Sequence, residues 1–122
     1  MELNEQTTYQ PYLLGRLFAI LEGLQQRANP SINTTIRDRY FNSACATPAI
    51  VFPQLIKLSQ AHLKKLDGGL STHYSRQLGS ILAMFESDYP LRLSLYDQGI
   101  FQLGYYHQVQ SRYTKKEEKK DV

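Results

Sequence analysis

The spacing of apolar side chains constrains this chain more than any other feature of its sequence. Five segments place apolar residues three or four positions apart, and no segment alternates apolar and polar residues as a half-buried strand does. A chain of 122 residues has the length of one domain and can bury well over half of its surface around a single core. The sequence therefore predicts an all-α protein, a compact bundle of about five helices.

Prolines, glycines and small polar residues set the predicted ends of these helices. Pro11 opens the first helix, in a first turn where proline is favoured, and Asn29-Pro30 stops it after Ala28. The other predicted helices run from Thr34 to Ala46 with Asn33 as the N-cap, from Thr47-Pro48 to Leu66, from a cap at Ser71 to Tyr89-Pro90, and from Ser94 onwards. Asp67-Gly68-Gly69 is expected to end the third helix with a left-handed glycine, and Ser94-x-x-Asp97 resembles a capping box.

The last predicted helix carries apolar or aromatic groups on most of its circumference, so we expect it to be the central element of the bundle. Gly99 and Gly104 on this helix would let neighbouring helices approach closely. The final segment, TKKEEKKDV, is highly charged, which predicts a solvated and disordered tail. The predicted organisation is a flexible N-terminus over residues 1–8, a helical bundle over 9–113 and the charged tail over 114–122.

Membrane and disulfide-dependent classes are excluded by composition. The longest uninterrupted apolar run, Ala49 to Phe52, is far shorter than the roughly 20 residues of a transmembrane helix. The N-terminal segment MELNEQTTYQ has glutamates where a secretory signal has basic residues. Cys45, the single cysteine, has no partner for an internal disulfide, and its small neighbours predict a role in close helix packing. We therefore expect a cytoplasmic protein without a membrane partner.

The sequence shows no grouping of residues suited to catalysis. The histidines His62, His73 and His107 are widely separated and form no pair at metal-ligand spacing. We expect His62 and His107 to be packed, hydrogen-bonded residues. The acidic residues are scattered, and the glycines at 68 and 69 lack the spacing and the lysine of a phosphate-binding loop. The chain is therefore predicted not to be an enzyme and to use no cofactor, metal or small-molecule ligand.

The placement of the cationic residues is more informative than the formal net charge of +3. On the third predicted helix, Lys57 and Lys64 fall within about 20° of each other and away from the apolar side, which includes Leu55, Leu58 and Leu63. Lys65 flanks them, and no carboxylate shares this face to form the usual pairs one turn apart. An uncompensated row of lysines favours an anionic partner.

The first helix adds a second set of cations. Arg16 and Arg27 project to one flank, about 16 Å apart along the axis, and predict a basic edge. Arg76 lies opposite the apolar stripe of the fourth predicted helix, and Arg112 is expected to be structural. The predicted phosphate contacts are Arg16, Arg27, Arg39, Lys57, Lys64, Lys65 and Arg76.

The segment TIRDRYFNSACATP looks like a compact site, but a helix would place its charged side chains on different faces. Arg37 and Arg39 are about 200° apart, so they cannot grip one ligand together. We expect Arg37 to lie along the core and pair locally, and Arg39 to point outwards. Asp38 and Tyr40 are predicted, like Arg37, to be structural or to lie at a subunit interface.

Several blocks in this sequence are similar, in order and spacing, to those of a known family. The blocks YLLGRLFA, IRDRYF, ATPAIVFP and DQGIFQLGYYHQ belong to a similarity that spans about residues 12 to 116. Together they resemble the C-terminal region of the large subunit of type I-C CRISPR effector complexes. In that family the region is also made as a separate polypeptide from an internal start and serves as the small subunit. A chain that begins with Met and ends soon after GYYHQ is expected of such a product.

The resemblance implies the partners and the task of the chain. A small subunit of this kind is a helical bundle present in more than one copy, packed against the large subunit, the repeated backbone subunits and its sister copies. It supports the duplex of CRISPR RNA and target DNA and lines the path of the displaced non-target strand, while base pairing reads the sequence. Recognition of the protospacer-adjacent motif and cleavage belong to other parts of such complexes. The implied location is the prokaryotic cytoplasm.

Three functions remain open on these grounds. The first is a non-catalytic subunit that binds nucleic-acid backbone and stabilises an R-loop in antiviral defence. The second is a helical scaffold for protein–protein contacts, whose cations give solubility or touch neighbouring subunits. The third, a small enzyme, is disfavoured by the missing catalytic groupings.

Overall fold

Five helices form the bundle in this computed structural model, which describes the backbone of residues 3–120 and the side chains of residues 3–113. They are α1 (Gln10–Ala28), α2 (Ile36–Ala46), α3 (Pro48–Lys65), α4 (Gly68–Ala83) and α5 (Leu95–Lys120). No strand occurs between residues 3 and 120. The predicted all-α bundle of five helices is confirmed. The disordered tail predicted for residues 114–122 lies outside the described side chains.

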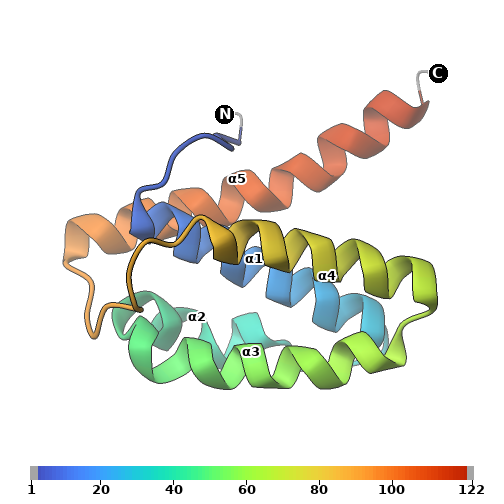
Figure 1. Ribbon diagram of the computed structural model, residues 1–122, viewed down its shortest axis with the longest axis horizontal. Coiled ribbons are helices and arrows are strands. Elements are labelled where there is room, and N and C mark those ends of the chain that lie inside the picture. The colour runs from blue at the N-terminus through green and yellow to red at the C-terminus, as the bar shows by residue number, and fades with distance from the viewer. Residues whose placement is uncertain (1–2, 121–122) are drawn as a thin grey trace.

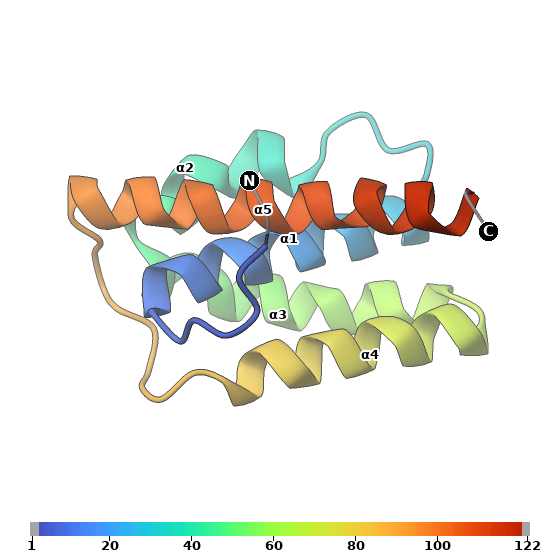
Figure 2. The same cartoon turned by 90° about the horizontal axis from the view of Figure 1, so that it is seen from above.

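Helix α1 is the centre of the bundle. Every residue from Pro11 to Gln25 is buried, and α1 contacts each of the other four helices. Figures 1 and 2 show α5 above α1, α3 below it, and α2 and α4 on opposite sides. The prediction that the last helix is central is wrong, because α5 is covered on one side only and leaves Leu95, Tyr96 and Tyr113 largely exposed.

The backbones of α1 and α5 touch. The two helices run in the same direction and diverge towards their C-terminal ends (Figure 1). A Cβ atom added at Gly104 would overlap the carbonyl oxygen of Tyr12, so this glycine allows the close approach that the sequence predicts. Gly99 has no atom within 4 Å of an added Cβ, and its predicted role in helix contact is wrong.

Aromatic rings join four of the helices around Phe18. The Phe18 ring is fully buried, and its centroid lies 5.5–6.4 Å from the ring centroids of Phe41, Phe52, Phe101 and Tyr105. Three of these pairs are edge-to-face, and aromatic pairs contribute about 0.5–1.5 kcal/mol beyond the area they bury. Because these rings come from α1, α2, α3 and α5, the cluster fixes the relative positions of those helices.

The helix caps differ in detail from the prediction. Thr35, not Asn33, is the N-cap of α2, and it forms a reciprocal capping box with Asp38. Asp67, not Ser71, caps α4, where its carboxylate accepts a 2.9 Å hydrogen bond from the backbone N–H of Leu70. Gly68 and Gly69 therefore form the first turn of α4. The prediction of a left-handed glycine is wrong, since no glycine among the described residues has a positive φ.

The long connection from α4 to α5 closes one end of the bundle. Helix α4 ends at Ala83, earlier than the predicted Tyr89-Pro90, because residues 84–94 run across the α2–α3 corner. The N–H of Ala49 donates to the carbonyl of Pro90 at 3.0 Å, and that of Leu93 donates to the carbonyl of Ala46 at 3.1 Å. Ser94 then caps α5 by accepting a 3.1 Å hydrogen bond from the N–H of Asp97.

Candidate nucleic-acid interface

The predicted lysine row lies on the solvent side of α3. Lys57, Lys64 and Lys65 are all exposed, and no described side chain forms an ion pair with them. The ammonium of Lys65 donates a 3.0 Å hydrogen bond to the side-chain oxygen of Asn29. Leu58, expected in the core, is instead 45% exposed beside this row. The surface of α3 is thus cationic with an apolar component.

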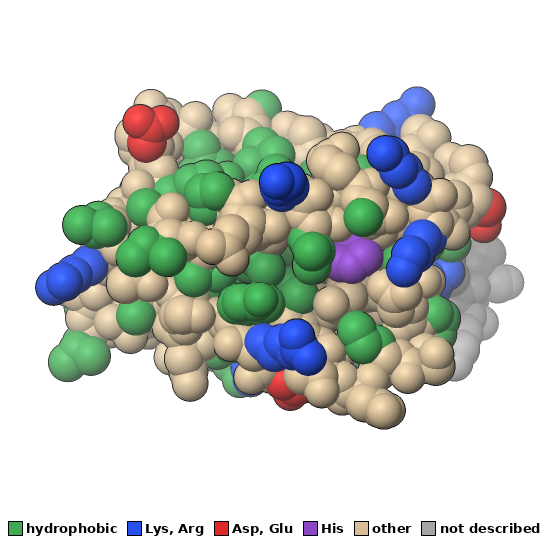
Figure 3. Space-filling view, turned by 90° about the horizontal axis from the view of Figure 1, so that it is seen from below, with side chains coloured by type: hydrophobic (Ala, Val, Ile, Leu, Met, Phe, Trp, Pro, Cys, Tyr) green, Lys and Arg blue, Asp and Glu red, His purple; other side chains and the backbone are tan. Residues whose placement is uncertain are grey.

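Helix α4 extends the same side of the molecule. It lies beside α3, joined to it by a short turn, and Arg76 is exposed on it. Figure 3 shows this side of the molecule: Lys and Arg side chains surround an apolar area, and acidic side chains appear only near its margins. We call Lys57, Lys64, Lys65 and Arg76 the α3–α4 basic face. Such a face attracts anions without an internal counter-charge to compete.

Arg16 does not belong to any exposed edge. Its side chain is 8% exposed, and its Nε donates a 2.9 Å hydrogen bond to Oε1 of Gln108 on α5. Burial lowers the pKa of Arg16. The prediction that Arg16 and Arg27 form one basic edge is therefore wrong: α4 and α5 cover the middle of α1, whereas Arg27 in its last turn remains exposed.

Arg37 and Arg39 of α2 lie on different faces of the helix, as their helical angles predict. The guanidinium carbon of Arg37 lies 4.2 Å from the centroid of the Phe41 ring, and its Nη2 donates a 2.8 Å hydrogen bond to the Tyr106 hydroxyl. Arg37 therefore lies along the core and makes its contacts within the bundle. The carboxylate of Asp38 accepts from the N–H of Thr35 at 3.0 Å, which makes Asp38 a cap of α2.

Tyr40 and Arg39, the two other predicted residues of α2, differ in their exposure to solvent. Tyr40 is half-buried and packs against the core, which gives it a structural role. Arg39 is exposed and lines a shallow hollow that also includes Thr34, Thr35 and Leu58. Because Leu58 belongs to α3, Arg39 lies near the α3–α4 basic face and can act with it on one extended anion.

The histidines and the cysteine are packing residues. The Nδ1 of His107 is 2.7 Å from the Tyr12 hydroxyl, as a packed and hydrogen-bonded histidine requires. His62 is buried as predicted, and its Nδ1 has no hydrogen-bond partner among the described atoms. Cys45 is buried with its Sγ 3.5 Å from the carbonyl oxygen of Gln98, and burial raises the pKa of the thiol. A neutral, enclosed thiol is unreactive.

Residues 1–113 match the family model described as CRISPR-associated protein (Cas_Csd1). The chain belongs to the Cas_Csd1 family. The match covers α1 to α4 and α5 as far as residue 113, and it confirms the resemblance to a CRISPR effector protein that the ordered sequence blocks indicate. No curated protein matches the chain.

Two further structural findings bear on chemistry in this Cas_Csd1 chain. Over the residues that the structure describes, no three His, Cys, Asp or Glu side chains are placed to hold a metal ion together. No helix within the same part is long and apolar enough to span a bilayer.

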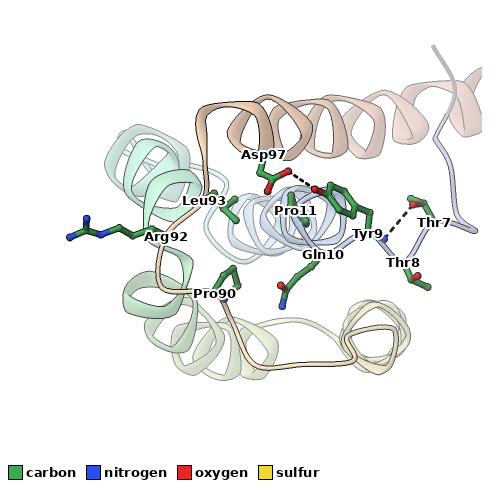
Figure 4. A pocket seen from close by; sticks show the side chains of 9 residues that line it. All are labelled: Thr7, Thr8, Tyr9, Gln10, Pro11, Pro90, Arg92, Leu93 and Asp97. Carbon is green, nitrogen blue, oxygen red and sulfur yellow. Dashed lines mark hydrogen bonds between the residues drawn. The ribbon is translucent and has the colours of Figure 1, made fainter.

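One hollow of the Cas_Csd1 chain, lined by Asp97 and Arg92 among others, is not a basic site. It has a volume of about 580 Å³ and lies between the N-terminal segment, the 84–94 connection and the start of α5. The Tyr9 hydroxyl donates a 2.6 Å hydrogen bond to the Asp97 carboxylate across it, and the Arg92 side chain points away from it (Figure 4). A carboxylate without an inward cation disfavours an anionic ligand at this place.

Sequence reasoning missed an apolar surface at this end of the Cas_Csd1 chain. Leu95 and Tyr96 are 86% and 74% exposed, and Ile50 and Leu91 are exposed on the neighbouring segments that the Ala49–Pro90 hydrogen bond joins. We call these four residues the end patch. The signal was present in the sequence, since Leu95 and Tyr96 directly follow the cap of α5, where one face of the helix has no partner.

Proposed function

We propose that this chain is a non-catalytic small subunit of a type I-C CRISPR effector complex, which binds nucleic-acid backbone and stabilises the R-loop. Membership of the Cas_Csd1 family supports a place in a CRISPR complex. The observation that carries backbone binding is the α3–α4 basic face, which is exposed and has acidic side chains only near its margins.

The chemistry of this face suits phosphate contacts. Lysine and arginine contacts along a strand release condensed counterions, so they supply affinity that does not depend on base sequence. A net charge of only +3 makes binding by the isolated chain weak, and neighbouring subunits in the complex raise the effective concentration of the strand. The proposed ligands are the displaced non-target strand and the duplex of CRISPR RNA with target DNA. The proposed protein partners are the large subunit, the repeated backbone subunits and further copies of this chain.

Charge reversal on α3 tests backbone binding. We expect the triple variant Lys57→Glu, Lys64→Glu, Lys65→Glu to assemble into the complex but to form R-loops at least about tenfold less well. For a single strand, the slope of log affinity against log salt should fall by about 2, since each lost phosphate contact removes about 0.7. The matched control replaces the same three lysines with arginine, which keeps the charge and should keep R-loop formation. Normal R-loop formation by assembled complexes that contain the reversed variant would contradict the proposal.

The end patch favours a second function, that of a scaffold. Leu91, Leu95 and Tyr96 expose large apolar side chains within one stretch of six residues, and exposed apolar surface often binds another protein. In this reading, Leu91→Ser with Leu95→Ser prevents assembly of the complex, whereas the lysine reversals have no effect on DNA. Purification of the complex with each variant, followed by R-loop measurement on what assembles, separates the two functions.

A further inference from the structure

A polar hollow lies at the opposite end of the bundle from the end patch, where α1 and α5 diverge beside the first half of α4. It has a volume of about 300 Å³, at the lower limit of ordinary ligand sites. The side chains that give it its chemistry are Arg27, His73, Tyr74, Gln77, Ser111 and Arg112. No Asp or Glu is among the described residues that line it. We call it the α1/α4/α5 pocket.

Gly23 makes room for one of the two arginines. A Cβ atom at this position would lie 3.2 Å from Cζ and Nη1 of Arg112, closer than a side chain usually allows. The Nη2 of Arg112 donates a 2.8 Å hydrogen bond to the carbonyl oxygen of Ala19 on α1. The guanidinium is thereby held flat against α1 at the wall of the pocket, with one edge committed to the protein.

Arg27 adds a second guanidinium one turn further along α1. Residues four apart lie on the same side of a helix, so Arg27 follows Gly23 towards the open end of the pocket. Its side chain is exposed, and among the described side chains it has neither an ion-pair nor a hydrogen-bond partner. One arginine is therefore fixed in place and the other is free to close on a ligand.

We propose that the α1/α4/α5 pocket binds a tetrahedral phosphate oxyanion. Guanidinium groups donate two parallel hydrogen bonds to phosphate oxygens, and two of them here face a cavity without a competing carboxylate. The Gln77 amide and the Ser111 hydroxyl supply further donors from α4 and α5. A cavity of this size holds a phosphate with water and is small for a whole nucleotide.

The phosphate can come from two sources. It can be a phosphodiester of a bound strand, in which case the inference rests on the proposed function, or the phosphate of a free nucleotide or inorganic phosphate. The chemistry at the pocket is the same in both cases. Neither source requires the α3–α4 basic face, so the two proposals can fail separately.

Titration of the full chain with inorganic phosphate, followed by amide and arginine side-chain NMR at constant ionic strength, tests the pocket directly. We expect saturable shifts at Gly23, Ser111 and Arg112, and small, linear shifts on α3. Sodium chloride at matched ionic strength should not reproduce them. A folded chain whose pocket resonances do not move with phosphate overturns the proposal.

Two substitutions and a control locate the binding. Arg27→Gln removes the free arginine, and Gln77→Glu places a carboxylate in the pocket at a half-buried position with little change of shape. Each should weaken phosphate binding at least about tenfold, as expected for a hydrogen bond to a charged group. Arg92→Gln makes the same charge change as Arg27→Gln on an exposed arginine outside this pocket, and it should leave the affinity unchanged. Equal affinities for all three variants and the wild type would overturn the assignment.

Two ligands then distinguish the sources. Thymidine 5′-monophosphate presents a free phosphate, and a short oligothymidine without terminal phosphates presents only phosphodiesters. Displacement of inorganic phosphate by the oligonucleotide identifies a strand, whereas displacement by the mononucleotide alone identifies a free phosphate. The triple lysine reversal on α3 should still bind inorganic phosphate at the pocket, and its failure to do so while folded would contradict a site separate from the basic face.

Discussion

Gly15 on α1 lies directly against the main chain of Phe101 on α5. A Cβ atom at residue 15 would overlap the carbonyl oxygen of Phe101 and lie 2.8 Å from the amide nitrogen of Tyr105. Gly104 makes the reciprocal contact with the carbonyl of Tyr12. One glycine from each helix thus sets how closely α1 and α5 pack, and every contact along this helix pair depends on that distance.

We expect Gly15→Ala and Gly104→Ala each to lower the free energy of unfolding by about 3 kcal/mol or more, because a methyl group would have to displace the backbone of the facing helix. Gly99→Ala is the matched control on α5. With no atom within 4 Å of the added Cβ, it should raise stability by about 0.5–1 kcal/mol through helix propensity. Urea unfolding followed by circular dichroism measures all three. Equal midpoints for the Gly15 and Gly99 variants would contradict this account.

Arg16 is predicted to affect stability and not binding. Arg16→Ala leaves the buried Oε1 of Gln108 without its 2.9 Å donor, which should cost about 1–3 kcal/mol. Arg27→Ala changes an exposed residue of the same helix and should shift stability by less than about 0.5 kcal/mol. Unfolding measurements on both variants test this contrast, and equal losses of stability for the two would contradict it.

The sequence was sufficient to predict which segments are helical, because apolar spacing and proline positions are local properties. It was not sufficient to predict which helix is central. Helix α1 carries Arg16, Glu22 and Gln25, and polar residues on several sides argue against full burial. Each of them finds a partner far along the chain: Gln108, the Tyr105 hydroxyl and the N–H of Ile36. Such partners cannot be recognised before the fold is known.

The candidate site likewise has features that the sequence predicts and features that depend on the fold. The exposure of Lys57, Lys64 and Lys65 follows from their helical angles, so the sequence predicts it. The burial of Arg16 does not follow, because Arg16 and Arg27 have the same angle and differ only in what covers them. The α1/α4/α5 pocket was missed for a related reason, since its donors come from three helices and no local motif joins them.

The hydrogen bond between Tyr105 and Glu22 should make the protein sensitive to alkali. The Tyr105 hydroxyl donates to the Glu22 carboxylate at 2.6 Å, and both residues are buried. Burial and the neighbouring carboxylate raise the pKa of Tyr105, so the folded state holds a proton that the unfolded chain releases near pH 10. Stability is therefore complete below pH 10 and falls above it, by up to about 1.4 kcal/mol per pH unit.

Tyr105→Phe separates this effect from the other tyrosines. The variant should be about 1–3 kcal/mol less stable at neutral pH, because Glu22 loses its donor, yet its stability should fall less steeply above pH 10. Tyr113→Phe, at a residue that is 61% exposed, should retain the wild-type alkaline slope. Urea midpoints between about pH 8 and 11, a range that extends about two units below and one unit above the unfolded-state pKa of about 10, provide the measurement. An unchanged slope in Tyr105→Phe would contradict the role of this pair.

His62 should have the opposite effect, at acid pH. Its imidazole is buried, Nδ1 has no partner among the described atoms, and burial together with the nearby Lys65 lowers its pKa. The unfolded chain therefore takes up a proton near pH 6.5 that the folded chain accepts only at lower pH, so stability is complete above pH 6.5 and declines below it. His62→Leu removes this titration and should flatten the decline, although burial also lowers the pKa of His107 and leaves part of it in place. Parallel stability curves for the wild type and His62→Leu between pH 7 and about 5 would show that His62 does not limit acid stability.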